Sequence, residues 1–189
     1  MAAVGPRYVD AADGHALAFV RCGRFRFVPV APAGAARFVA LDFLISSGSL
    51  IRMSVLERVG PMDESLFIDH VDTEWCLRAK ALGFEPIGAC QAWMGHQLGE
   101  RTLRISFGRM RTVPLHKPFR YYFIARNSLL LYQRTYVRRS WIVPDAVRLA
   151  QVAVFFGLLH PNRMANARMI FRGLRDGLRG VTGPGPLAG

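Results

Sequence analysis

The stretch Phe67-Ile-Asp-His-Val-Asp-Thr-Glu-Trp-Cys-Leu-Arg78, extended by Ala-Lys-Ala-Leu82, carries the clearest helical pattern in the chain. Trp75, Ala79 and Leu82 recur at i, i+4 and i+7, so they share one face of a helix, and Glu74 and Arg78 are predicted to form an i, i+4 ion pair. The spacing predicts a helix over residues 72–82 with that face apolar, closed by the glycine that follows.

Short extended segments lie on both sides of this helix in the sequence. Residues 16–21, 25–30, 37–45 and 85–92 are rich in apolar and β-branched residues and are predicted to be strands. The third of these is the most apolar and is expected to be a buried strand that runs into Ser46-Ser47-Gly48. A short helix is predicted for residues 54–59, because Gly60-Pro61 stops it.

Beyond residue 100 the sequence changes to arginine and aromatic residues. Helices are predicted over 119–136, over 141–160 after a start at Pro144, and over 164–178. Residues 101–189 carry 16 basic side chains and only two acidic ones, whereas residues 1–100 carry 9 basic and 11 acidic. The second part is therefore expected to seek a negative surface.

Composition limits the class of protein. With 189 residues, 51% hydrophobic and 20% charged, the chain is long enough to bury a core, which excludes a disordered tail or a disulfide-stapled miniprotein. The basic residues are nearly all arginines, which bind phosphates in a planar fork. The three cysteines form no C-x-x-C pair, and they fit a reducing cytosol.

The stretch from Asp63 to Glu74 places five carboxylates and His70 in twelve residues. One interpretation is that Asp72 caps the helix, since an aspartate side chain accepts the free N–H groups of a first turn. The other is that one carboxylate is a general base, held and stabilised as an anion by the helix N-terminus.

Two further groups have competing interpretations. His96, at the end of the last predicted strand, is either a hydrogen-bonded loop residue or a ligand for a divalent metal, which would need two more ligands. The sequence contains no D-x-D pair. Ser46-Ser47-Gly48 either forms a simple turn or presents hydroxyl and N–H groups to a ligand.

Considered together, these residues resemble the C-terminal half of inverting family 2 glycosyltransferases of the GT-A fold, most closely bacterial rhamnosyltransferases that build O-antigen and lipopolysaccharide. The resemblance covers about residues 1–135. The matching stretches are Ala3-Val-Gly-Pro6, Leu44-Ile-Ser-Ser-Gly48, Val59-Gly60 with Met62-Asp63-Glu64, Phe67–Arg78, His96-Gln-Leu-Gly99, Phe119-Arg-Tyr-Tyr122 and Arg126-Asn127.

The resemblance implies an α/β fold, a partial GT-A domain with a mixed sheet and flanking helices over residues 1–118. A basic amphipathic helical region over 119–182 and a flexible tail over 183–189 would follow it. It implies direct displacement on a nucleotide sugar, dTDP-rhamnose, by a hydroxyl of a polysaccharide or lipid-linked acceptor, with inversion.

The resemblance also assigns roles to single residues. It implies Asp72 as the catalytic base and His96 as a ligand of Mg²⁺ or Mn²⁺ and its diphosphate. It places acceptor-binding residues at Ser47, Gly48, Asp69, Glu74 and Trp75. The nucleotide-binding half with its D-x-D motif has no counterpart here, so the chain is expected to be a fragment or to work with a polypeptide that supplies that half.

The expected location is the inner face of the cytoplasmic membrane. No secretory signal is predicted, and the apolar run Leu149 to Leu159 is shorter than the about 20 residues that a bilayer crossing takes. An interfacial helix pair is predicted instead, because apolar runs alternate with basic residues there. Its membrane-contacting residues are expected to be Phe155, Phe156, Arg168, Arg172 and Arg175.

Three alternatives stay open at this point. The tail's apolar residues could pack on the catalytic part while its arginines are solvated. The chain could be a catalytically silent remnant. It could also be a basic module that stacks nucleic acid on Tyr121, Tyr122 and Tyr132. Long apolar runs such as residues 152–156 argue against the last, and no nucleic-acid partner is expected.

Overall fold

A computed structural model of the chain describes residues 1–10, 14–30, 34–96, 101–106 and 110–185. The strands are β1 (Ala3–Asp10), β2 (Ala16–Leu17), β3 (Phe19–Cys22), β4 (Phe27–Val30), β5 (Phe38–Ala40), β6 (Leu50–Ile51), β7 (Ile87–His96), β8 (Arg101–Ser106) and β9 (Met110–Leu115). The helices are α1 (Met53–Val59), α2 (Val71–Ala81), α3 (Pro118–Tyr132), α4 (Arg139–Val154), continued by a π-helical turn at Phe155–Leu159, and α5 (Arg163–Leu178). A 3-10 turn spans Glu64–Leu66.

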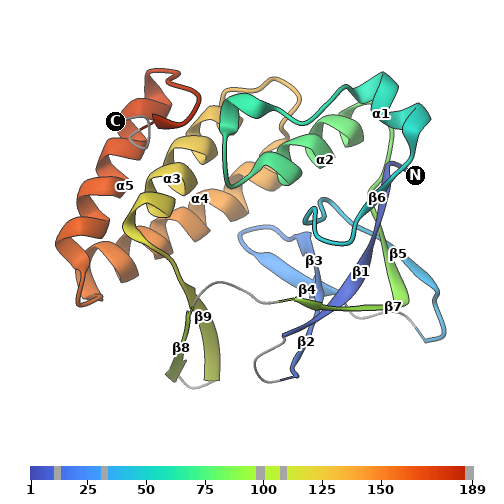
Figure 1. The fold of residues 1–189 in the computed structure, drawn as a ribbon, viewed down its shortest axis with the longest axis horizontal. Coiled ribbons are helices and arrows are strands. Elements are labelled where there is room, and N and C mark those ends of the chain that lie inside the picture. The colour runs from blue at the N-terminus through green and yellow to red at the C-terminus, as the bar shows by residue number, and fades with distance from the viewer. Residues whose placement is uncertain (11–13, 31–33, 97–100, 107–109, 186–189) are drawn as a thin grey trace.

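The main sheet is mixed, which confirms the predicted α/β class. Its order is β2-β1-β7-β5, and β6 pairs with the start of β1. Strands β1 and β7 are parallel, whereas β2, β5 and β6 pair antiparallel to their neighbours. Parallel neighbours need a long crossover connection, and here the crossover contains α1 and α2. Figure 1 shows these two helices along one edge of the strands, with α3, α4 and α5 grouped beyond α2.

Helix α2 joins the two parts of the core. Its buried Trp75, Cys76 and Ala79 pack with residues of the sheet and α1. Leu77, on another face of the same helix, packs with Leu131 of α3 and other residues around α4. Trp75 and Ala79, predicted to share one apolar face, therefore serve the same core, whereas Leu82, predicted on that face, is 55% exposed.

Helices α3 and α5 cross at very short range. A Cβ atom added at Gly173 would meet the carbonyl oxygen of Tyr122, and one at Gly177 would meet that of Arg126. Only glycine lets the two backbones approach so closely, so these positions fix α5 against α3. The third core forms here, among α3, α4 and α5.

Two predicted elements differ from the structure. Of the predicted buried strand 37–45, only β5 is a strand, and its Phe38 is 60% exposed because β5 lies at the sheet edge. Helix α4 begins at Arg139, so Pro144 lies inside it rather than at its start. A proline there removes one helical N–H bond, which the packing of Trp141 and Leu149 into two cores offsets.

The division at residue 118 stays a prediction. Hydrogen bonds cross it, since Arg126 and Asn127 of α3 bond the carbonyl oxygen of Leu66 at 2.8 and 3.0 Å. The beginning of the predicted flexible tail is also bonded, because the Gly183 N–H donates to Ser65 O at 2.6 Å. Residues 186–189 of that tail lie outside the described residues.

Candidate active site

The loop before α2 has an unusual backbone. Phe67, Asp69 and His70 all have positive φ, at 63°, 62° and 61°. Each such non-glycine residue costs about 1–3 kcal/mol and persists only where the surroundings over-determine it. Here Asn127 does so, because its Nδ2 donates to the carbonyl oxygens of Leu66, Ile68 and Asp69 at 2.8–3.0 Å. The loop is therefore held in a strained shape from α3.

Asp72 lies in the first turn of α2, but it is not the cap. The N-cap is His70, which makes no side-chain cap bond, so the predicted cap position is wrong, although Asp72 still accepts one first-turn N–H. The Asp72 carboxylate instead accepts from the Thr73 N–H at 2.7 Å and from the Ser46 N–H at 3.0 Å. These bonds orient an anion at the positive end of the helix.

The Ser46-Ser47-Gly48 segment forms the turn that the sequence allowed, and it lies beside Asp72. The Ser49 N–H donates to Ser46 O at 3.1 Å, and Gly48 has φ 65°. A side chain at Gly48 would also collide with Met94 and Pro6. The turn is therefore fixed by glycine and brings the Ser46 N–H to the carboxylate.

Tyr8 of β1 links this turn to His96, and sequence reasoning missed it. Its hydroxyl donates to Ser47 O at 2.7 Å, and its ring centroid lies 5.5 Å from that of His96. Burial raises the pKa of Tyr8; a hydrogen bond with Ser49 opposes the rise and the charge of Asp72 adds to it. The predicted residues Asp72, Ser47 and His96 therefore converge, with Tyr8 between them.

The residues present do not make a complete metal site. His96 stands opposite Asp10 in the β1–β7 register, but no group of three His, Cys, Asp or Glu side chains suited to a metal occurs within the described ranges. A hard divalent cation takes about six oxygen-rich ligands. His96 therefore supplies at most one of the ligands that such a cation needs.

Glu74 and Trp75, predicted to bind an acceptor, are each only 1% exposed. The Glu74 carboxylate pairs with Arg78, as the i, i+4 spacing predicted, and accepts from the Tyr136 hydroxyl at 2.5 Å. Trp75 donates its indole N–H to Gly60 O at 2.9 Å. Both side chains face the interior, so they fix α2 and are not available to an acceptor in this structure.

Asp69, unlike the buried Glu74 and Trp75, lies at the wall of a cavity. Its carboxylate receives the Arg120 guanidinium through Nε at 3.2 Å and Nη2 at 2.5 Å. It also lines the largest cavity described, of about 390 Å³. The lining residues are Val20, Phe27, Phe43, Asp69, His70, Thr73, His116, Ile124, Trp141, Asp145 and Arg148.

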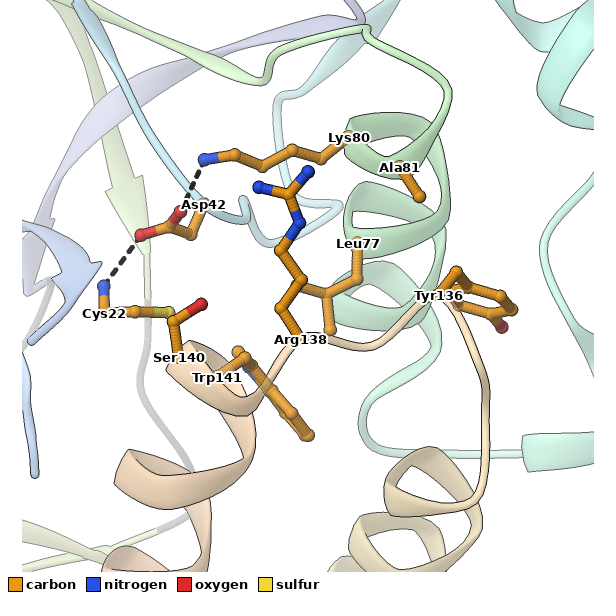
Figure 2. Close-up of a pocket in the computed structure, with 9 residues that line it drawn as sticks. All are labelled: Cys22, Asp42, Leu77, Lys80, Ala81, Tyr136, Arg138, Ser140 and Trp141. Carbon is orange, nitrogen blue, oxygen red and sulfur yellow. Dashed lines mark hydrogen bonds and ion pairs between the residues drawn. The ribbon is translucent and has the colours of Figure 1, made fainter. Parts of the chain in front are cut away.

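A smaller hollow of about 110 Å³ lies between the β3 end, α2 and α4. Figure 2 shows the Asp42 carboxylate between the Cys22 backbone nitrogen, at 2.7 Å, and the Lys80 ammonium, at 2.5 Å. Burial and the neighbouring Asp42 charge raise the pKa of the Cys22 thiol to about 12. The thiol is therefore protonated and unreactive, and the ion pair serves to join the sheet side to α2.

The predicted membrane contacts divide into two groups. Arg168, Arg172 and Arg175 are exposed on α5. Phe156 is only 4% exposed and packs against the Tyr121 ring at 4.6 Å, so it is a core residue rather than a lipid contact. Phe155 is partly buried against the same core. Other apolar side chains are exposed around this region: Val154, Leu158, Leu159, Met164, Phe171 and Leu178.

The helical stretch that contains the apolar run Leu149 to Leu159 is longer than that run. Residues Arg139–Leu159 form one helical stretch of 21 residues that is long and apolar enough to cross a membrane by length and composition. The same stretch contributes Asp145, which is 1% exposed and bonded to the Tyr132 hydroxyl of α3 at 2.8 Å.

Comparison with known proteins agrees with the resemblance seen in the motifs. The chain is 34% identical over 149 residues to the dTDP-rhamnosyl transferase RfbF of Shigella flexneri, an alignment that covers 75% of this chain and 47% of that protein. No protein-family model and no solved structure matches the chain. The chain spans about half the length of this relative and is related to that part of a rhamnosyltransferase.

Proposed function

We propose that the chain is the acceptor-side, base-carrying part of an inverting glycosyltransferase of the GT-A type, which transfers rhamnose from dTDP-rhamnose. The acceptor would be a polysaccharide or a lipid-linked saccharide of the O-antigen and lipopolysaccharide class. The observation that carries the proposal is the 34% identity to a dTDP-rhamnosyl transferase. The convergence of Asp72, Ser47, Tyr8 and His96 supports it.

In the proposed reaction Asp72 is the general base. Its carboxylate removes the proton of an acceptor hydroxyl as that oxygen attacks the anomeric carbon of the sugar. The bond from the anomeric carbon to the diphosphate oxygen breaks, and the nucleoside diphosphate leaves with the bonding electrons. A single displacement inverts the anomeric centre. The N–H groups of Ser46 and Thr73 hold the carboxylate in one orientation before the proton moves.

A divalent cation stays part of the proposal as the group that neutralises the leaving diphosphate. His96 is the residue of this chain proposed to contact it. The remaining ligands, and the nucleotide-binding surface, would come from the part of the enzyme that the chain does not cover.

We further propose that the protein lies on the cytoplasmic face of the cytoplasmic membrane. Exposed Leu158, Leu159 and Phe171 supply apolar contact, and the α5 arginines supply positive charge for anionic headgroups. A peripheral position suits α4 better than a spanning one, because Asp145 within it is bonded to α3. Arg139–Leu159 inserted across the bilayer would lose that contact.

The test of the base is transfer of labelled rhamnose from dTDP-rhamnose, measured for the chain combined with the remaining part of the related enzyme. Asp72→Asn keeps the side-chain size but cannot accept the proton, so turnover is expected to fall by about 10²–10⁴. Asp63→Asn is the matched control, since Asp63 pairs with Arg134 away from the turn, and it should keep wild-type turnover. Near-wild-type transfer by Asp72→Asn, or an equal loss in Asp63→Asn, would remove Asp72 from the mechanism.

A further inference from the structure

The cavity of about 390 Å³ contains features that the base mechanism does not use. Its volume lies within the range of small-molecule sites, about 300–1,000 Å³. Phe27 of β4, Phe43 and Trp141 of α4 provide aromatic lining. Polar groups come from the start of α2 and from α4, which are far apart in the sequence. Together they form a hollow with both an aromatic and a polar lining.

His70, which lines this cavity, has a buried ring with one unpartnered nitrogen. Its side chain is 7% exposed, and its Nδ1 has no hydrogen-bond partner among the described residues. The other nitrogen, Nε2, lies 3.0 Å from Arg148 Nη2. An arginine nitrogen can only donate, so Nε2 accepts and the ring N–H is on Nδ1. The ring therefore holds a buried N–H donor that lacks an acceptor.

The position of the ring is fixed from α4. Arg148 donates to Asp145 Oδ1 through Nε at 2.9 Å and Nη2 at 2.6 Å, and the His70 ring meets Trp141 edge to face at 5.9 Å. Asp145 also lies 3.6 Å from Nε2, too far for a hydrogen bond. The His70 donor is thus held in place before any ligand arrives.

The charged groups of the cavity cancel one another. Asp69 is paired with Arg120, and Asp145 with Arg148. Burial, and then the charge of Arg120, lower the pKa of His116, so its ring is neutral at pH 7. An anionic diphosphate would find no uncompensated positive charge here, whereas a neutral polyhydroxylated ring finds donors, acceptors and aromatic faces.

We infer that this cavity binds a neutral sugar ring of the acceptor, with the His70 Nδ1–H donating to one of its oxygens and Phe27 and Phe43 against its C–H face. This inference rests on the proposed function, because the bound sugar is an acceptor only if the protein is a glycosyltransferase. The position agrees with it, since Thr73 lines the cavity and its N–H donates to Asp72, and Phe43 of the cavity is followed in the chain by residues 44–46, which line a separate hollow together with Asp72. His70 is then a binding residue that positions the acceptor.

The first test needs no catalysis. Side-chain ¹H–¹⁵N NMR of the intact chain reports which nitrogen of His70 carries the proton, and Nδ1 is expected. The methyl glycosides of rhamnose, glucose, galactose and N-acetylglucosamine are then added in turn, with inorganic diphosphate as the anionic comparison. At least one glycoside should shift the Nδ1–H resonance, and diphosphate should not.

Two variants separate the two ring nitrogens. The amide of His70→Asn can place a donor near the position of Nδ1, and asparagine tolerates the positive φ at this site. His70→Gln places its amide nearer Nε2. We expect glycoside binding to be retained in His70→Asn and weakened about tenfold in His70→Gln, the loss of one hydrogen bond. In the transfer assay the same loss appears as a tenfold higher acceptor KM with an unchanged donor KM.

Phe27→Leu provides a second variant if His70→Gln does not fold, because it removes only the aromatic face and should also weaken the glycoside. A proton on Nε2, no shift with any glycoside, or a shift with diphosphate would overturn the inference. Equal binding by His70→Asn, His70→Gln and Phe27→Leu would do the same. Glycoside binding without any transfer, once the chain is combined with the remaining part of the enzyme, would refute the proposed function alone, and transfer unaffected by His70→Gln would refute this inference alone.

Discussion

Helices α3 and α5 both carry arginines, but those of α3 are bonded inside the molecule whereas those of α5 are exposed to solvent. Arg126 of α3 is fully buried and donates to the carbonyl oxygens of Leu66 and Gly183 at 2.8 and 2.6 Å. Arg120, on the same helix, holds Asp69. On α5, by contrast, Arg168 is exposed, and among the described residues Arg172 and Arg175 form their ion pairs with Asp176 of the same helix.

The difference shows that net charge is a poor guide to where a charge acts. Two carboxylates of the acidic stretch 63–74 form ion pairs with arginines of the basic second part: Asp63 with Arg134, and Asp69 with Arg120. Those arginines are used inside the molecule and build the strained loop before α2. The arginines of α5 are not used in this way and stay exposed, so they remain available to an anionic surface.

The largest effect on stability is expected from Arg126→Met. The change leaves the half-buried Gly183 carbonyl without this donor and weakens the support of the buried Leu66 carbonyl beside the strained loop. Each unsatisfied buried group costs about 1–3 kcal/mol, so we expect a loss of about 3 kcal/mol in the free energy of unfolding. Urea unfolding followed by circular dichroism measures it, and a loss below 1 kcal/mol would contradict the role given to Arg126.

Asp145→Asn should have a smaller effect that depends on pH. Burial alone would raise the pKa of Asp145, but the bonded Arg148 guanidinium lowers it well below its ordinary value, while His70, Tyr132 of α3 and Cys22 of β3 are the other titratable neighbours. A depressed carboxyl pKa stabilises the fold above the ordinary value of 3.8 and loses that stabilisation as pH falls through the folded-state pKa.

At pH 7 we therefore expect Asp145→Asn to lower the free energy of unfolding by about 2 kcal/mol, the value of hydrogen bonds to a charged group. The difference from the wild type should shrink as the pH is lowered below about 4. Urea titrations at pH 3, 4, 5 and 7 measure it. A difference that stays constant across the series, or grows toward acid, would show that Asp145 is not a stabilising anion.

Membrane binding should depend on α5 and not on α3. Replacing Arg168, Arg172 and Arg175 together by Gln removes charges that are worth about 1 kcal/mol each near an anionic surface. Co-sedimentation with vesicles of anionic and of neutral lipid, across a salt series, is the measurement. The matched control replaces three exposed arginines elsewhere, Arg24, Arg26 and Arg37, by Gln. Equal losses in both triple variants would mean that binding follows total charge rather than the α5 face.

The smallest effect is expected from Arg168→Met, which repeats the Arg126 change at an exposed site. Surface substitutions away from special features usually stay within about 0.5 kcal/mol, so the unfolding free energy should not move beyond that. The same urea titration compares the two variants directly. If Arg168→Met destabilises as much as Arg126→Met, the contrast between the helices is wrong.

Local features were predictable from the sequence because they depend on periodicity and stop residues. The i, i+4 spacing gave the Glu74–Arg78 pair, and the glycine stops gave the ends of α1 and α2. The motif at Phe67–Arg78 gave the relationship to a rhamnosyltransferase that the comparison confirms. Each of these depends on residues within a few positions of one another.

The rest was decided by contacts between residues far apart in the sequence, which no short stretch of sequence reveals. Arg120 meets Asp69 across 51 positions and Arg148 meets His70 across 78, and neither pair has a local signature. The positive φ of Phe67, Asp69 and His70 could not be predicted, because none of them is a glycine. The hydrogen bonds from Asn127 of α3 hold the loop in that conformation. Phe156 likewise became core rather than surface when Tyr121 packed against it. The sequence thus determined the elements and the residue types of the site, and packing determined which charges are buried, which ring nitrogen is left to donate and which face remains for a membrane.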